Sequence, residues 1–288
     1  MSIAPAVNAW FEREKRDLPW RADGYPAWGI LVSEIMLQQT PVVRVIPRLD
    51  QWLARWPTPA SLAASSPGDA VRAWERLGYP RRALNLHAAS VVITERHGGI
   101  VPADVDELLA LPGVGDYTAR AVAAFAYGRR HPVVDTNVRR VLARAIDGNG
   151  EASPASTRRD LAAMEAQLPT DPVDARVFNA AVMELGAVVC TARAPRCEAC
   201  PIANRCAWRA AGYPPYAGAR RATQKKYEGS DRQVRGLILG ALRTEEGTLE
   251  ASALDALWPD ALQRGRALDG LLQDGLVVGT PATGYALP

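Results

Sequence analysis

The sequence has 288 residues, of which 48% are hydrophobic and 23% charged, a composition typical of a folded globular protein. This composition excludes disorder for the bulk of the chain, and no apolar run reaches the roughly 18 residues that a membrane span requires. Charged residues follow the N-terminus too closely for a secretory signal peptide. We therefore expect a soluble, cytoplasmic protein with no membrane partner.

Helices are expected over most of residues 1–226, because apolar residues recur at helical spacing and alternating strand patterns are almost absent. The apolar run Trp28–Gln39 contains a single carboxylate and indicates a buried helix. Pro41 and Pro47 interrupt the pattern that follows it. One helix is expected to follow Asn137, and the others cover residues 5–16, 69–77, 82–93, 104–110, 116–127, 158–168 and 174–190.

The C-terminal segment differs from the rest in both pattern and charge. Residues 1–226 carry 29 Lys and Arg against 22 Asp and Glu, a net of +7, whereas residues 227–288 carry 5 against 9, a net of −4. The body therefore suits a polyanionic partner and the C-terminal segment does not. Three expected helices and two short strands in residues 231–287 resemble a winged-helix module, for which a packing or protein-contact role fits the acidic balance best.

The glycines of Leu111-Pro112-Gly113-Val114-Gly115 allow a tight turn whose backbone N–H groups face out at the start of the next helix. Such a turn is either a phosphate cradle or a simple helix-to-helix connection. Asp135 lies 20 residues beyond Gly115 and precedes another helix. It is either a helix N-cap or a carboxylate that stabilises positive charge on the sugar of a bound nucleotide.

Glu34 interrupts the apolar run around it, so it is either buried or part of a solvated stripe. Burial disfavours the charged form of a carboxyl group and raises its pKa, which suits a general acid.

The four cysteines lie within 17 residues in the pattern C-x6-C-x2-C-x5-C. Clustered thiols in an intracellular protein indicate a metal site, and the spacing alone is compatible with an iron–sulfur cluster or with zinc.

These motifs, in this order and at these distances, resemble the helix-hairpin-helix DNA glycosylases of the endonuclease III superfamily. Within it the chain is similar to the MutY-type adenine DNA glycosylases over about residues 8–215. The matching stretches include Leu18-Pro19-Trp20-Arg21, Ser33-Glu34-Ile35-Met36-Leu37-Gln38-Gln39-Thr40, Leu77-Gly78-Tyr79, Asn85-Leu86-His87, Val134-Asp135-Thr136-Asn137-Val138-Arg139-Arg140-Val141-Leu142, Phe178-Asn179 and Leu185-Gly186-Ala187.

The resemblance implies an all-α, two-lobed fold that binds double-stranded DNA containing a mispaired adenine. Residues 24–131 would form a six-helix lobe that includes the hairpin, and residues 1–23 with 132–212 would form the cluster lobe. A linker over 213–226 and the small domain 227–288 would complete a monomer. The expected cofactor is a 4Fe-4S cluster, and the expected location is the cytoplasm, in association with the nucleoid.

The resemblance also assigns roles to single residues. Glu34 would protonate the adenine, Asp135 would stabilise the sugar cation, Asn137 would support that carboxylate, and Tyr117 would lie beside the sugar. The remaining candidates are Arg21 in the adenine pocket, residues of the duplex contact (Leu37, Gln39, Thr40, Tyr79, Gly113, Val114 and Gly115) and the cluster ligands Cys190, Cys197, Cys200 and Cys206.

Three features distinguish the chain from other members of this superfamily. Relatives that also nick the strand place a lysine at the position of Tyr117, and residues 16–224 contain no lysine. This predicts hydrolysis without strand cleavage. Ala180 stands where the family often has Glu or Gln, and the residues after Lys226 are too few for the Nudix-like domain that helps to find 8-oxoguanine. The alternatives are a glycosylase that removes mispaired thymine or uracil, and a non-catalytic DNA-binding protein.

Overall fold

The structure, a computed structural model, describes residues 2–218, 226–245 and 247–288. In this part of the chain the only strands form one two-stranded hairpin and the rest of the regular structure is helical, so the predicted all-α class is confirmed. The chain divides into two compact units. The described residues of Met1–Ile30, Ala103–Ala110 and Val114–Ala222 form unit 1, and those of Leu31–Pro102, Leu111–Gly113 and Thr223–Pro288 form unit 2. The lobe boundaries expected from the sequence stay a prediction.

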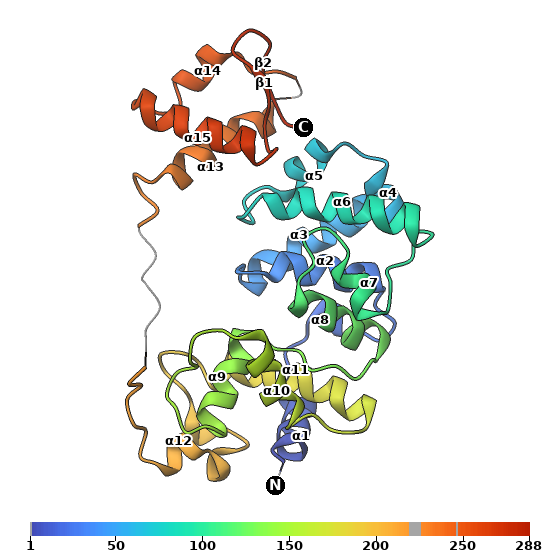
Figure 1. Ribbon diagram of the computed structural model, residues 1–288, viewed down its shortest axis with the longest axis vertical. Coiled ribbons are helices and arrows are strands. Elements are labelled where there is room, and N and C mark those ends of the chain that lie inside the picture. Colours follow the sequence, from blue (N-terminus) through green and yellow to red (C-terminus); the bar gives the residue numbers. More distant parts are fainter. Residues whose placement is uncertain (1, 219–225, 246) are drawn as a thin grey trace. The chain divides into compact units, whose positions relative to one another are not determined.

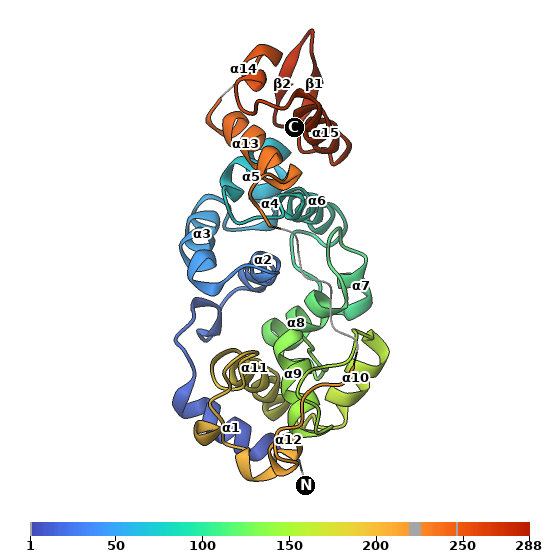
Figure 2. The same cartoon turned by 90° about the vertical axis from the view of Figure 1, so that its left-hand side faces the viewer.

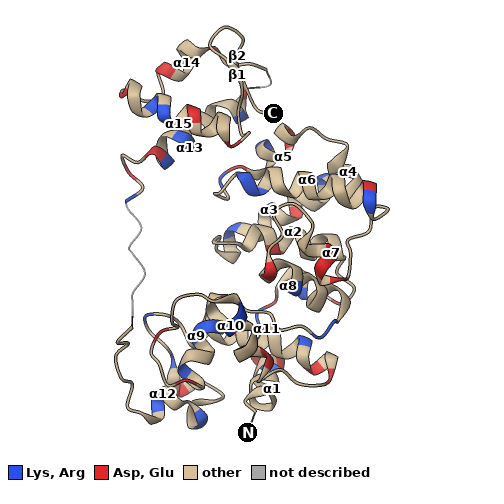
Figure 3. Cartoon of the chain, viewed as in Figure 1, with Lys and Arg blue, Asp and Glu red and all other residues tan. Residues whose placement is uncertain are grey.

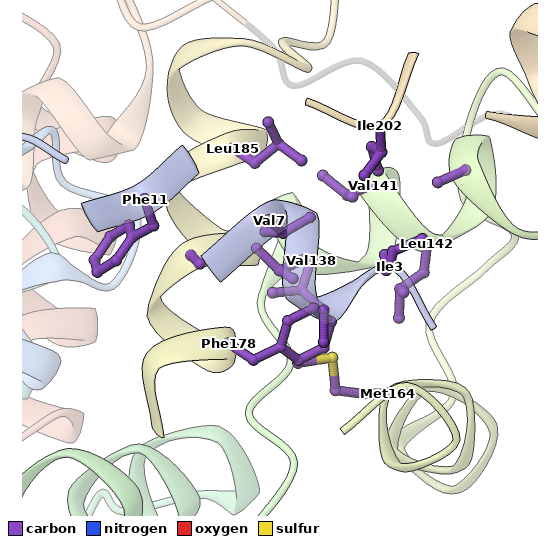
Figure 4. Packing of buried hydrophobic residues seen from close by; sticks show 14 of the residues in the cluster. Ile3, Val7, Phe11, Val138, Val141, Leu142, Met164, Phe178, Leu185 and Ile202 are labelled. Atoms are coloured by element: carbon purple, nitrogen blue, oxygen red, sulfur yellow. The ribbon is translucent and has the colours of Figure 1, made fainter. Parts of the chain in front are cut away.

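Unit 1 is built around three helices, α1, α9 and α11, whose apolar faces share one core (Figures 1 and 4). Val7, Trp10 and Phe11 of α1 lie at helical spacing and are buried. Phe178 of α11 is fully buried as well. The elements of unit 1 are α1 (Ala4–Glu14), the 3-10 turn η1 (Pro19–Arg21), the first part of α2 (Ala27–Leu37), α7 (Val105–Leu109), α8 (Asp116–Tyr127), α9 (Thr136–Ala145), α10 (Thr157–Glu165), α11 (Pro172–Val188), η2 (Cys197–Ala199), η3 (Ala203–Arg205) and α12 (Ala207–Ala210).

Unit 2 contains the second part of α2 and a layer of helices in which α6 packs against α4 and α5. Trp52 is fully buried and makes edge contacts with the rings of Trp56 and Trp74, at centroid distances of 4.6 and 5.6 Å. Each such aromatic pair adds about 0.5–1.5 kcal/mol beyond the burial of its surface. The helices of this layer are α3 (Val42–Arg55), α4 (Pro59–Ala63), α5 (Pro67–Trp74) and α6 (Arg81–Arg96).

The structure corrects the reading of Pro47 as an interruption. Pro47 lies inside α3, on an exposed part of the helix. Proline removes one backbone hydrogen bond, but a carbonyl left without its partner on an exposed face is solvated by water. Val45, Leu49 and Trp52 line the buried face of the same helix, so core packing outweighs the cost of the proline.

The C-terminal part of unit 2 has the elements that the sequence predicts. Helices α13 (Asp231–Thr244), α14 (Ala251–Asp255) and α15 (Ala261–Gln273) precede the antiparallel strands β1 (Val278–Thr280) and β2 (Gly284–Ala286) (Figure 2). Leu249 adds a single bridge to Tyr285. The pattern of residues 275–278 predicts the first strand, but it begins only at Val278, and Leu276 and Val277 are buried ahead of it. Most of the expected linker, residues 219–225, lies outside the described residues.

Among the described residues, no helix combines the length and the apolarity needed to cross a membrane.

Candidate active site and cluster loop

Asp135 is both the N-cap of α9 and the centre of a side-chain network in unit 1. Its Oδ1 accepts a hydrogen bond from the backbone N–H of Val138 at 2.7 Å, which caps the helix. Its Oδ2 accepts a second hydrogen bond from Nδ2 of Asn137, also at 2.7 Å. The two uses considered for Asp135 are therefore compatible, since one oxygen holds the helix end and the other is held by an amide.

The environment of Asp135 makes its negative charge costly. Burial raises the pKa of Asp135 above its ordinary value, although hydrogen bonds from Val138 and Asn137 and the positive charge of Arg140 act to lower it. A poorly solvated carboxylate of this kind attracts a cation more strongly than one in water, because less solvent screens the interaction. The geometry therefore suits stabilisation of positive charge that develops during a reaction.

Arg140 supports Asn137 from the opposite side. Its Nη2 donates to Oδ1 of Asn137 and to the carbonyl of Gly186, each at 2.7 Å, and its Nε donates to the carbonyl of Cys190 at 2.7 Å. One guanidinium thus connects the amide that holds Asp135 to the first cysteine of the cluster loop. A Cβ on Gly186 would lie 2.7 Å from Cβ of Asn137, so helices α9 and α11 approach closely at this point.

The turn Leu111–Gly115 leads into α8, as the sequence predicts. Gly113 adopts the left-handed conformation, with φ of 75°, and a Cβ there would lie 2.5 Å from Cβ of Asn85. Gly115 is the N-cap of α8 and exposed, whereas Val114 is buried. Tyr117 lies in the first turn of α8 and packs against a small core of that helix. An exposed backbone turn at a helix N-terminus is suited to an anionic group.

Glu34 lies in the part of α2 that belongs to unit 2, whereas Asp135 belongs to unit 1. The side chain of Glu34 is 4% exposed, which settles the choice between a buried group and a solvated stripe in favour of burial. A buried carboxyl group in an apolar helix is a candidate proton donor.

Two turns of unit 2 that carry predicted duplex-contacting residues lie side by side. Gln39 and Tyr79 are exposed and adopt left-handed conformations, with φ of 55° and 47°. Thr40 is buried, and its hydroxyl donates to the carbonyl of Leu77 at 3.0 Å, which joins the two turns. Leu37, at the end of α2, precedes the first turn. Non-glycine residues in this conformation are strained and persist where the surroundings hold them, often at functional sites.

Arg82 is the group that holds both turns, and sequence reasoning missed it. It is 8% exposed, and its Nη1 donates to the carbonyls of Ile35, Met36 and Gln38 at 2.7, 3.0 and 2.7 Å. Its Nη2 donates to the carbonyl of Gly78 at 2.9 Å and to Oγ1 of Thr40 at 3.0 Å. The fork of an arginine supplies these donors with fixed geometry, which a lysine does not.

Arg21 lies in an ion-pair network with Glu184, a second group that sequence reasoning missed. Glu184 is 1% exposed and accepts bonds from Arg16 at 2.7 Å and Arg21 at 2.8 Å. Burial acts to raise the pKa of Glu184, but the bonds from Arg16 and Arg21 outweigh it and hold the pKa at about 2. Glu184 interrupts an apolar run of α11 just as Glu34 interrupts α2, so the same sequence signal marks both carboxylates.

The four cysteines line one pocket in unit 1, together with Arg144 and Trp208. None of the four forms a disulfide. Four thiols on one loop are a donor set that suits an iron–sulfur cluster or zinc, the two alternatives that the spacing leaves open.

Arg144 fastens the start of the cluster loop to α9. It is 4% exposed and donates to the carbonyls of Thr191 at 2.7 Å and Ala192 at 3.0 Å. Its guanidinium lies 4.7 Å from the ring centroid of Trp208, a cation–π contact between two residues that line the same pocket. Burial and the neighbouring cysteines raise the pKa of Cys200 to about 11. The Cys200 thiol becomes a thiolate more readily beside a compensating cation, which fits a metal centre at this loop.

Comparison with known proteins gives two family matches. Residues 32–165 match the HhH-GPD superfamily of base excision DNA repair proteins, and residues 190–206 match the iron–sulfur binding domain of endonuclease III. Among solved structures, a thermostable thymine-DNA glycosylase is 26% identical, with a TM-score of 0.65 over 72% of this chain and 95% of that one. A non-covalent endonuclease III–DNA complex, 21% identical with a TM-score of 0.62 over 73% and 96%, shares the fold.

The class is thus a helix-hairpin-helix base excision repair protein with a 4Fe-4S cluster. Among curated relatives, an adenine DNA glycosylase of Mycolicibacterium smegmatis is 54% identical over 100% of this chain and 97% of its own length. A thymine/uracil-DNA glycosylase of Pyrobaculum aerophilum is 37% identical over 69% and 87%. The chain belongs to the adenine DNA glycosylases, enzymes that hydrolyse N-glycosyl bonds, as the sequence predicts.

Proposed function

We propose that the protein is a monofunctional glycosylase that removes adenine paired with 8-oxoguanine or guanine in double-stranded DNA. The observation that carries this proposal is the Asp135 carboxylate, which is poorly solvated and held at both oxygens. Base excision develops positive charge on the deoxyribose, and this carboxylate stabilises it. The relative from Mycolicibacterium smegmatis, which aligns over almost its whole length, supports adenine as the base.

The chemistry needs one proton donor and one carboxylate. Glu34 donates a proton to the adenine ring, so that the base leaves as a neutral molecule when the bond to the sugar breaks. Asp135 stabilises the sugar cation until water adds, and Asn137 holds the carboxylate in place. The products are free adenine and an abasic site. Because residues 16–224 contain no lysine, no Schiff base forms there and the strand stays intact.

Duplex recognition is assigned to the exposed turns. Tyr79 and Gln39 enter the base stack as the adenine is extruded, with Leu37 beside them, and the turn Gly113–Gly115 binds a backbone phosphate. Arg21 and Tyr117 line the pocket for the base and sugar. Ala180, half-buried against the unit 1 core, brings no polar group to that pocket.

We infer that the enzyme acts as a monomer in the cytoplasm, at the nucleoid. The 4Fe-4S cluster, held by Cys190, Cys197, Cys200 and Cys206, braces the loop that receives the Arg140 bond.

The test is single-turnover cleavage of four matched duplexes that contain A·8-oxoguanine, A·G, T·G or U·G, with alkali treatment to reveal abasic sites. We expect cleavage of the adenine strand, visible only after alkali. The variants Asp135→Asn and Glu34→Gln are the controls and should bind duplex without cutting it. Full activity in either variant would remove that residue from the mechanism.

A second candidate function is removal of thymine or uracil opposite guanine. It is favoured by the likeness to the thymine/uracil-DNA glycosylase of Pyrobaculum aerophilum and to the thermostable thymine-DNA glycosylase. Cleavage confined to the T·G and U·G duplexes would establish this activity in place of adenine excision.

A further inference from the structure

The C-terminal segment, residues 227–288, contacts α5 through two arginines that cap each other's helices. Arg72 of α5 donates from Nε to the carbonyl of Arg243 at 3.1 Å and from Nη2 to the carbonyl of Glu245 at 2.8 Å, at the end of α13. Arg243 in turn donates from Nε to the carbonyl of Val71 at 3.0 Å, in the last turn of α5. Each guanidinium thus meets the carbonyls that a helix C-terminus leaves without partners.

Two more contacts extend this interface along the same layer of unit 2. Nη1 of Arg81, the first residue of α6, lies 3.3 Å from Oδ1 of Asp274, which follows α15. At the start of α5, a Cβ added to Gly68 would lie 2.3 Å from the carbonyl oxygen of Pro288 and 3.2 Å from Cβ of Leu287. The C-terminal segment is therefore seated closely on both helices.

The charges of the C-terminal segment speak against contact with DNA. The segment has a net charge of −4. Figure 3 marks the charged residues along the helices of this segment. Its five arginines all contact carboxylates or carbonyls: Arg243 caps α5, Arg235 pairs with Asp274, Arg264 with Asp255, Arg266 with Asp231, and Arg232 donates to the carbonyl of Lys226. An acidic surface whose cations are engaged in this way repels a phosphate backbone.

The C-terminal segment contacts residues on both sides of the turn that carries Tyr79. Arg72 lies just before the turn and Arg81 just after it. Within the turn, Glu75, Gly78 and Tyr79 adopt left-handed conformations, with φ of 43°, 85° and 47°. Because such a turn is strained, it depends on its surroundings to stay in this form.

We propose that residues 227–288 are an intramolecular brace, which binds α5 and α6 and holds the Glu75–Tyr79 turn in the form that presents Tyr79 to the duplex. The partner of this surface is the chain's own catalytic part, and the segment does not read DNA. The proposal rests on the proposed function in one respect, the insertion of Tyr79 into DNA.

The seating of the brace is tested in the full-length protein by exchanging glycines. Gly68→Ala introduces a methyl group against Pro288, whereas Gly240→Ala in α13 meets no atom within 4 Å. Alanine is the better helix former, so without a seated segment both exchanges raise the melting temperature or leave it unchanged. We expect Gly68→Ala to lower it by several degrees and Gly240→Ala not to. Equal changes of the melting temperature in the two variants would show that the C-terminal segment does not pack against α5.

The role of the brace is tested with Arg72→Met, matched by Arg266→Met, whose arginine is 61% exposed. We expect Arg72→Met to slow single-turnover excision from A·8-oxoguanine by about 10-fold, and Arg266→Met to leave it unchanged. The slope of log Kd against log salt should stay the same in both variants. A slope reduced by about 0.9 would show that Arg72 binds a phosphate, and would overturn the proposal.

These readouts separate the two proposals. A wild-type protein that cuts no duplex, with Gly68→Ala still lowering the melting temperature, would refute the proposed function while the seating stands. An active enzyme whose excision rate does not change in Arg72→Met would refute the brace alone.

Discussion

Oδ2 of Asp135 and Nδ2 of Asn137 are joined by a hydrogen bond of 2.7 Å, while the other carboxylate oxygen caps α9. The same carboxylate therefore caps a helix and takes part in the proposed reaction. Its buried charge lowers the stability of the folded protein. Burial raises its pKa, which means that ionisation of this group is less favourable in the folded than in the unfolded chain.

The exchange Asp135→Asn should separate these two roles. Asparagine is as good an N-cap as aspartate, but it carries no charge to stabilise the sugar cation. We expect excision to fall by at least about 10²–10³-fold while duplex affinity is kept. Since the ionised carboxylate opposes folding at neutral pH, the variant should melt at a higher temperature than the wild type. A lower melting temperature at pH 7 would contradict the inferred environment of Asp135.

The effect of pH on excision should depend on Asn137. Its amide lowers the pKa of Asp135, so Asn137→Ala should raise that pKa further above its ordinary value. The reaction needs the ionised carboxylate and is lost as the pH falls through its pKa. The acidic limb of the pH–rate profile should therefore move to higher pH in the variant. An acidic limb that stays in place would show that Asn137 does not act through Asp135.

Local patterns predicted much of the local structure around the candidate site, because the signals for it lie close together in the sequence. The expected helix 116–127 has the observed bounds, since Gly115 caps its start and Gly128 takes the left-handed conformation at its end. For Glu34 the apolar neighbours left two alternatives, burial or a solvated stripe, and only the structure decides for burial. The role of Arg82 could not be read in this way, because the carbonyls of Ile35, Met36 and Gln38 come from a segment more than 40 residues away. Helix α3 was missed because long-range packing overrides the local effect of Pro47.

Arg82→Lys should loosen both turns that carry duplex-contacting residues. A lysine has one nitrogen in place of the fork that reaches the Ile35 and Gln38 carbonyls on one side and Gly78 on the other. Hydrogen bonds that involve a charged group are worth about 1.5–3 kcal/mol each, so we expect a loss of about 2–4 kcal/mol of unfolding free energy. Arg96→Lys, at an exposed position of the same helix, should change it by less than about 0.5 kcal/mol. Denaturant unfolding measures both, and equal losses would contradict the assignment.

Gly186→Ala should disturb the active site without touching a reacting group. The added Cβ would lie 2.7 Å from Cβ and 2.9 Å from the carbonyl oxygen of Asn137, so α9 and α11 must move apart. Overpacking of this kind costs about 1–3 kcal/mol of stability. Because Asn137 holds Asp135, excision should fall more than duplex affinity does. Gly240→Ala is the matched helical control, and a Gly186→Ala enzyme with wild-type excision and stability would show that the two helices adapt.

The cluster loop gives a prediction that needs no DNA. The purified protein should be brown, with broad absorption near ~400 nm and about four iron atoms per chain. Cys200→Ser removes one thiolate and should lower both the absorption and the melting temperature, because binding of the cluster contributes to folding of the loop. Arg193→Lys, which keeps the charge of the same loop, should alter neither. Colourless wild-type protein with stoichiometric zinc would contradict the cluster.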